Sequence, residues 1–310
     1  MPANPSSQGR MARIMDSDLV FGFLNSKLTV FAAVIVLLLL VSALLTPWIA
    51  PYDPYDPTQL FIMDSHIPPV WAEGGDWRFL LGTDDQGRDL FSAMLYGLRL
   101  SLTISLVGIF FATILGVGLG LIAGYVGGAI DALIMRIADI QLTFPAILVA
   151  LLIDGAAHGA LGGEYTEDTA FMVLVVSIAL SFWVKYARVV RGSVLVERNK
   201  EYVQAARLVG RSPIAIMFDH ILPNVMGPIL VILTINFGLA VIAEATLSFL
   251  GVGLPPTKPS LGTLIRVGQQ FLFSGEWWVV VFPGILLGVL VLTINLVGDW
   301  LRDALNPKLR

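Results

Sequence analysis

Residues 100–124 read LSLTISLVGIFFATILGVGLGLIAG, an uncharged run of 25 residues. An α-helix needs about 20 apolar residues to cross the hydrocarbon core of a bilayer, so this run is long enough to span a membrane. Small residues recur at every fourth position of it, at Ala112, Gly116, Gly120 and Gly124. Residues at this spacing share one helix face, and small side chains there let a second helix backbone approach closely. The stretch therefore predicts a membrane-spanning helix with one close-packed face.

The composition of the whole chain indicates the same environment. Of the 310 residues, 56% are hydrophobic and only 14% are charged, whereas soluble domains carry about 25% charged residues. We therefore expect an all-α polytopic membrane protein with six transmembrane helices. The six apolar stretches are 28–49, 100–124, 134–153, 171–192, 227–249 and 279–301.

Two of these stretches are less clear than the others, and the first stretch needs to be distinguished from a cleaved leader. The stretch 134–153 carries Asp139, Gln141 and Pro145 in its first half. In 171–192, Lys185, Arg188 and Arg191 follow the first 14 residues, and such cations can extend to lipid headgroups, so this stretch is retained as a span. The stretch 28–49 is longer than a signal-peptide core of about 7–15 residues, so we expect an uncleaved span.

The distribution of Lys and Arg predicts the orientation. With the N-terminus inside, 14 of the 19 cationic residues fall on the inner side and five on the outer side. Inner segments of membrane proteins carry this excess, so both termini should be cytoplasmic. The remaining segments are then an N-terminal tail at 1–27, an outer loop at 50–99, an inner loop at 193–226, an outer loop at 251–278 and a C-terminal tail at 302–310.

The sequence offers little for catalysis or for cofactor binding. It has no cysteine and no GxxxxGK[ST] loop, and its net charge of −4 argues against a nucleic-acid partner. The predicted orientation puts His66 and His158 outside and His220 inside, so the three histidines cannot bind one metal ion. We expect no catalytic residue, no cofactor and no metal site, and hence no enzyme.

Two polar residues inside the fifth stretch are candidates for a translocation pathway. Asn236 and Glu244 lie at membrane depth, where polar groups usually face a bundle interior or a wet cavity. Either residue could line the pathway or could form hydrogen bonds between helices. Glu244 also lies within a turn or two of the outer boundary, so the sequence leaves both alternatives open.

The inner loop 193–226 reads as folded rather than extended. Residues 201–209 have a helical pattern, and Gly210 follows as a helix stop. Ser212 then precedes Pro213, the favoured order for a helix cap and a first helical residue, and this second helix should end at Leu222-Pro223. Two alanines, Ala205 and Ala206, leave a flat surface beside Arg207 and Arg211, and such a surface suits docking into a groove of a partner protein.

This loop resembles the EAA loop in the permease subunits of binding-protein-dependent ABC importers. The family pattern is EAA, three residues, glycine, nine residues and I-x-L-P, and this chain has Gln204-Ala205-Ala206, Gly210 and 220–223 at the same spacing. Gln204 replaces the glutamate and His220 replaces the isoleucine. The segments LGTDDQGRD at 81–89, GYVGG at 124–128 and LSFLGVG at 247–253 resemble the peptide/nickel branch, in the subunit type with a long first periplasmic loop.

The resemblance implies a type I ABC importer permease fold in a bacterial inner (plasma) membrane, surrounded by lipid. It also implies a second homologous permease subunit, two cytoplasmic ABC ATPase subunits, an extracytoplasmic substrate-binding protein, and peptides or similar small solutes as substrates. By resemblance, the contact with the ATPase would involve Gln204, Ala205, Ala206, Arg207, Gly210, Arg211, Ser212 and Pro213. The alternative is an ion-gradient-driven secondary transporter, but such proteins often carry inverted repeats, and we find none in this sequence.

The orientation can be tested with single cysteines in this cysteine-free chain. His66→Cys and His158→Cys should react with an impermeant thiol reagent added to intact cells, whereas His220→Cys should react only after permeabilisation. Labelling of His158→Cys only after permeabilisation would contradict the predicted orientation.

Overall fold

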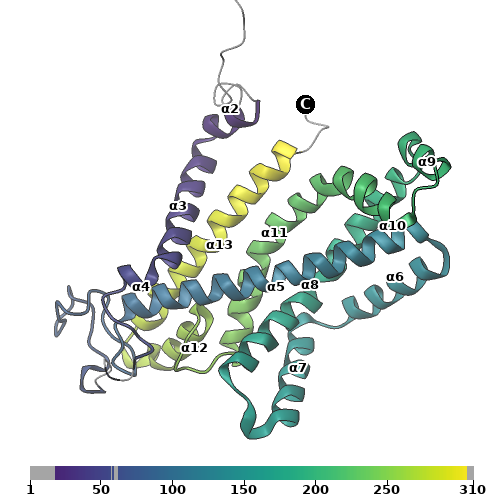
Figure 1. Ribbon diagram of the computed structural model, residues 1–310. Coiled ribbons are helices and arrows are strands. Elements are labelled where there is room, and N and C mark those ends of the chain that lie inside the picture. Colours follow the sequence, from purple (N-terminus) through teal and green to yellow (C-terminus); the bar gives the residue numbers. More distant parts are fainter. Residues whose placement is uncertain (1–17, 57, 59–61, 306–310) are drawn as a thin grey trace, which may run out of the picture.

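The computed structural model describes residues 18–56, 58 and 62–305, and this part is helical apart from turns and one isolated β-bridge between Thr83 and Asp89 (Figure 1). The long helices are α3 (Lys27–Leu44), α5 (Leu90–Val126), α8 (Glu167–Glu197), α11 (Leu222–Phe249) and α13 (Trp278–Leu305). The shorter ones are α2 (Asp18–Asn25), α4 (Thr46–Ile49), α6 (Gly128–Thr143), α7 (Ala146–Leu161), α9 (Glu201–Leu208), α10 (Pro213–Ala215) and α12 (Leu261–Phe271).

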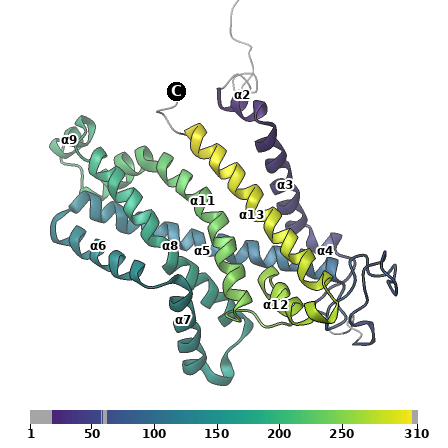
Figure 2. The ribbon, with the colours of Figure 1, turned by 180° about the vertical axis from the view of Figure 1, so that it is seen from behind.

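The expectation of an all-α polytopic membrane protein is confirmed. In the described part, five helices are long and apolar enough to cross a membrane, and α6 with α7 makes a sixth span if this bent pair is taken as one. Figures 1 and 2 show α9 and α12 at opposite ends of the bundle, which we call the α9 end and the α12 end.

The third stretch, 134–153, is not one straight helix as predicted. It crosses the break between α6 and α7, where the two helices meet at an angle of 91°. Phe144 is extended at this break (φ −93°, ψ 128°) and Pro145 caps α7. A proline disfavours helical geometry at the residue before it, which accounts for the bend.

Other boundaries also differ from those predicted. Helix α5 begins at Leu90, so the loop 50–99 ends ten residues early, and the Asp89 side chain caps the helix by accepting from the Ser92 amide at 2.8 Å. Helix α3 ends at Leu44, and the short α4 follows it. Helix α8 continues to Glu197, so less of 193–226 is loop than expected.

The second helix of the inner loop does not end at Pro223. A π-helical segment, Ile216–Ile221, joins α10 to α11, so helix continues from Pro213 to Phe249. Pro223 lies in the first turn of α11. Its ring would crowd the carbonyl four residues earlier in a regular α-helix, and the wider π-turn before it gives that carbonyl room.

The most extensive helix contact in the described part of the bundle is between α5 and α8, and the glycine face of α5 lies in it. A Cβ added at Gly116 would lie 2.4 Å from the Trp183 carbonyl oxygen, and one at Gly120 would lie 2.7 Å from the Ala187 carbonyl oxygen. Real Cβ atoms do not approach backbone this closely, so only glycine permits the observed distance. The close-packed face predicted from the small-residue spacing is confirmed.

This packing predicts opposite effects for two neighbouring glycines on α5. The Cβ of Gly120→Ala would also lie 2.8 Å from Cβ of Val190, so this substitution must push the two helices apart. The expected loss in the free energy of unfolding is about 1–3 kcal/mol. A Cβ added at Gly118 would have no neighbouring atom within 4 Å. Gly118→Ala should therefore keep or raise the thermal stability, because alanine has a better helix propensity than glycine. Thermal unfolding of the purified protein in detergent measures both. Equal midpoints for the two variants would contradict the glycine contact.

Candidate functional site

The turn after α9 is built as the sequence predicted. Gly210 has a positive φ of +82°. Its amide donates to the Arg207 carbonyl at 3.0 Å, and the Arg211 amide donates to the Ala206 carbonyl at 3.1 Å. These two bonds form a Schellman motif, in which glycine avoids the strain of the left-handed conformation. Ser212 then accepts from the Ala215 amide at 3.3 Å and caps the next helix, with Pro213 in its first turn.

Most of the candidate docking residues lie on the surface of this turn, at the α9 end (Figures 1 and 2). The exposed members are Gln204, Ala205, Arg207, Gly210, Arg211, Ser212 and Pro213. Ala206 differs, because it is half-buried and packs against the apolar cluster that anchors α9. No side chain lies within 4 Å of a Cβ added at Gly210, so the surface around the turn is open.

The sequence analysis missed the most exposed apolar residues at this turn. Leu208 and Val209 are 89% and 84% exposed, and Ile214 and Phe218 on the next helical segment are 66% and 54% exposed. A signal was available, because two adjacent apolar residues directly before a helix stop cannot both face inward. We use the name coupling surface for five residues of this turn: Leu208, Val209, Gly210, Ile214 and Phe218.

Helix α9 is attached firmly to the ends of α5 and α8. Val203 is buried in a cluster with Leu121 of α5 and Val194 of α8. The Arg207 guanidinium lies over the Tyr125 ring, 4.9 Å from its centre, so Arg207 is engaged within its own chain. Arg198, just after α8, donates to the Gly124 carbonyl at 2.8 Å.

Two polar side chains secure the connection between α8 and α9. Gln204 donates from Nε2 to the Asn199 carbonyl at 3.0 Å, so it faces this connection. The Tyr202 hydroxyl donates to Glu197 at 2.5 Å. Burial, followed by this hydrogen bond, raises the pKa of Tyr202 to about 12, so the hydroxyl remains a donor at neutral pH.

The cations near the end of α8 have partners on α6. Arg191 binds Asp131 with two hydrogen bonds of 2.5 and 2.7 Å, and Arg188 binds Asp139 at 2.5 Å. The sequence had indicated lipid headgroups as their surroundings. These ion pairs instead hold the α6 half of the bent pair against α8.

Asn236 and Glu244 are both buried in α11. The Glu244 carboxyl accepts from the Ser248 hydroxyl at 2.8 Å, one turn further along the same helix, and its Oε2 is buried without a hydrogen-bond partner among the described residues. This hydrogen bond therefore lies within α11 and not between helices. For Asn236, the side-chain nitrogen is buried without a hydrogen-bond partner.

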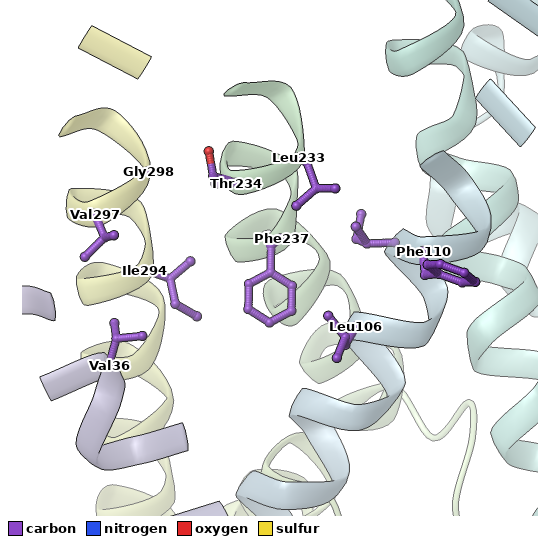
Figure 3. Close-up of a pocket in the computed structure, with 10 residues that line it drawn as sticks. Val36, Leu106, Phe110, Leu233, Thr234, Phe237, Ile294, Val297 and Gly298 are labelled. Atoms are coloured by element: carbon purple, nitrogen blue, oxygen red, sulfur yellow. The ribbon is translucent and has the colours of Figure 1, made fainter. Parts of the chain in front are cut away.

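An apolar pocket of about 270 Å³ lies between α3, α5, α11 and α13 (Figure 3). Neither Asn236 nor Glu244 lines it; its walls include Phe110, Phe237 and Ile294. Its one hydroxyl, on Thr234, donates to the Val231 carbonyl of its own helix at 2.9 Å. The pocket therefore offers only apolar contacts to an occupant.

The segment LGTDDQGRD forms a lock at the α12 end. Arg88 is buried, its Nε donates to Asp84 at 2.6 Å, and its NH1 donates to the Pro256 carbonyl at 2.7 Å. Trp278, the first residue of α13, donates from its indole to the Thr83 carbonyl at 3.1 Å. These bonds attach the long loop before α5 to the turn before α12 and to α13.

The described residues include no group of three His, Cys, Asp or Glu side chains that could hold a metal ion. The geometry at the α9 end suits protein binding, because it presents an exposed apolar turn on an anchored helix.

Comparisons with known proteins show the family to which this chain is related. Residues 116–310 match the family described as binding-protein-dependent transport system inner membrane component, and residues 18–69 match the N-terminal TM domain of oligopeptide transport permease C. The chain is 41% identical to the dipeptide transport system permease protein DppC of Escherichia coli, over 93% of this chain and 91% of that protein. It is 40% identical to the di/tripeptide transport system permease protein DppC of Pseudomonas aeruginosa, over 93% of this chain and 90% of that protein.

The fold is also similar to that of a solved structure. An inward-facing form of the MetNI methionine ABC transporter aligns with a TM-score of 0.55 at 20% identity, over 69% of this chain and 96% of that chain. At this identity the likeness shows the fold alone, which is that of ABC transporter permeases. Together with the family matches, these findings show that the chain belongs to the binding-protein-dependent transport system inner membrane components and is a transmembrane permease subunit of an ABC importer.

Proposed function

We propose that this permease forms, with a second homologous permease subunit, a pathway that carries peptides into the cytoplasm. Two cytoplasmic ABC ATPase subunits supply the energy, and an extracytoplasmic binding protein delivers the substrate. The di- and tripeptide transport named for the two DppC relatives supports peptides as the substrate class, because both align over nine-tenths or more of their length. Family membership favours this function over an ion-gradient-driven secondary transporter.

The observation that carries the proposal is the coupling surface. Leu208 and Val209 expose large apolar side chains beside a glycine turn whose own surface is open. An exposed apolar patch outside the membrane marks a protein contact. The ATPase subunit covers this patch, with Gln204, Ala205, Gly210, Arg211, Ser212 and Pro213 around it, while Ala206 and Arg207 hold α9 to its own chain.

The connections of α9 explain how a movement of the ATPase reaches the pathway. On one side α9 follows α8, and on the other the helix from Pro213 to Phe249 runs to the α12 end of the bundle. A displacement of the coupling surface therefore acts directly on two membrane-spanning helices.

The proposed orientation follows from the charge distribution. The α9 end and both termini face the cytoplasm of a bacterial cell, with the tails 1–27 and 302–310 and the coupling loop 193–226 on that side. The α12 end faces outward. Its surface, formed by the loop before α5 and the segment 251–278 that Arg88 locks together, receives the binding protein.

The coupling role predicts that substitutions on this surface uncouple ATP hydrolysis. Gly210→Val forces a β-branched residue to a φ of +82° and should lower uptake by roughly tenfold, since that strain costs about 1–2 kcal/mol. Gly210→Asn is the matched control, because asparagine tolerates this conformation. Val209→Glu should act like Gly210→Val, with Val209→Leu as its apolar control.

The measurements are peptide uptake and ATP hydrolysis stimulated by the loaded binding protein, both in the assembled complex. Ala206→Glu is a poorer test, because it would disturb the packing of Ala206 against the apolar cluster that anchors α9. Wild-type uptake and stimulation in both Gly210→Val and Val209→Glu would contradict the coupling role.

A further inference from the structure

A second pocket, of about 310 Å³, lies at the α12 end. It is formed between the connection from α7 to α8 and the turn from α11 to α12, which Figure 1 shows near each other. Its polar walls are His158, Tyr165, Glu167 and Arg266. A volume of this size is within the range of small-ligand sites, about 300–1,000 Å³.

Arg266 is the one cation on this wall whose charge has no partner among the described residues. Its Nε is buried and has no hydrogen-bond acceptor, and no carboxylate of the described chain lies within ion-pair distance of its guanidinium. The acidic groups nearby are already engaged. Glu167 binds the Lys258 ammonium at 2.5 Å, and Asp154 accepts from the Tyr165 hydroxyl at 2.8 Å.

The surrounding backbone holds the guanidinium in place. Gly251 has a φ of +90°, and a Cβ there would lie 2.8 Å from NH1 of Arg266. Helix α12 itself cannot shift easily, because Gly262 packs on the Ala245 backbone of α11, with an added Cβ only 2.3 Å from its carbonyl oxygen. Arg266 is therefore carried by a helix whose backbone packs closely on α11, and its guanidinium lies against the Gly251 turn.

Arg266 is half-buried, and its buried Nε is shielded from water and has no counter-charge beside it among the described residues, so a carboxylate is the group that best satisfies it. Its two oxygens match the guanidinium fork and form paired, charge-assisted hydrogen bonds. His158 stacks on Tyr165 with ring centres 3.6 Å apart, so a flat aromatic wall stands beside the charge. The pocket therefore suits a small molecule that ends in a carboxylate.

We propose that this pocket binds the C-terminal carboxylate of a peptide as the peptide enters the pathway. The inference rests on the proposed function in two respects, the peptide substrate and the outward orientation of the α12 end. A peptide importer must accept many side chains, and the terminal carboxylate is common to all of its unmodified substrates. Arg266 thereby recognises the terminal carboxylate that all of these peptides share. The pocket beside it leaves room for side chains that differ from one peptide to the next.

The test uses the assembled complex in proteoliposomes, with saturating binding protein loaded with radiolabelled dialanine. Arg266→Met should lower the maximal uptake rate by about tenfold, the scale of one lost charge-assisted pair. Arg266→Lys keeps the charge but loses the fork, so its rate should be intermediate. Arg99→Met is the matched control, because Arg99 is an exposed cation outside this pocket, and its rate should equal wild type.

Co-purification with the partner subunits establishes that each variant assembles, and Arg266→Lys carries the test if Arg266→Met does not assemble. Wild-type maximal rates for the Arg266 variants would overturn the proposal. An unchanged maximal rate with a higher half-saturating concentration of binding protein would also overturn it, because the carboxylate would then belong to that protein. Failure of the wild-type complex to import dialanine would instead refute the peptide substrate, and with it the proposed function.

Discussion

The contact of α5 with α8 determines where both ends of this permease lie. Gly116, Gly120 and Gly124 let the two backbones meet at a distance that any side chain would prevent. Lipid provides no hydrophobic drive between helices, so close van der Waals packing must supply the attraction. At one end of this pair Arg88 holds the loop before α5 to the turn before α12, and at the other end Arg198 donates to the Gly124 carbonyl beside α9.

Helix α11 joins these two ends by a different route. It begins at the π-helical segment next to the coupling surface and ends at the turn that presents Gly251 to Arg266. Near that end the buried Glu244 accepts from Ser248 of the same helix. One continuous helix, from Pro213 to Phe249, thus joins the coupling surface to the turn beside Arg266.

Local patterns were sufficient for the helices, the glycine face, the Gly210 stop and the Ser212 cap, because each depends on residues within one or two turns. The bend at Pro145 and the π-helical join at Pro223 were missed, since a proline in an apolar run can bend, end or widen a helix. Longer-range features lay beyond the sequence. Arg88 meets Pro256 across 168 positions, and the lack of a partner for Arg266 becomes visible only when every nearby acid is placed.

Contact between the coupling surface and an ATPase subunit can be tested by cross-linking in the assembled complex. Val209→Cys, in this cysteine-free chain, would be joined to the assembled complex by a short photoactivatable thiol cross-linker, with Leu152→Cys, an exposed position on α7, as the control. We expect position 209 to cross-link to the ATPase subunit and position 152 not to do so. An intact, ATP-hydrolysing complex in which position 209 reaches no ATPase subunit would contradict it.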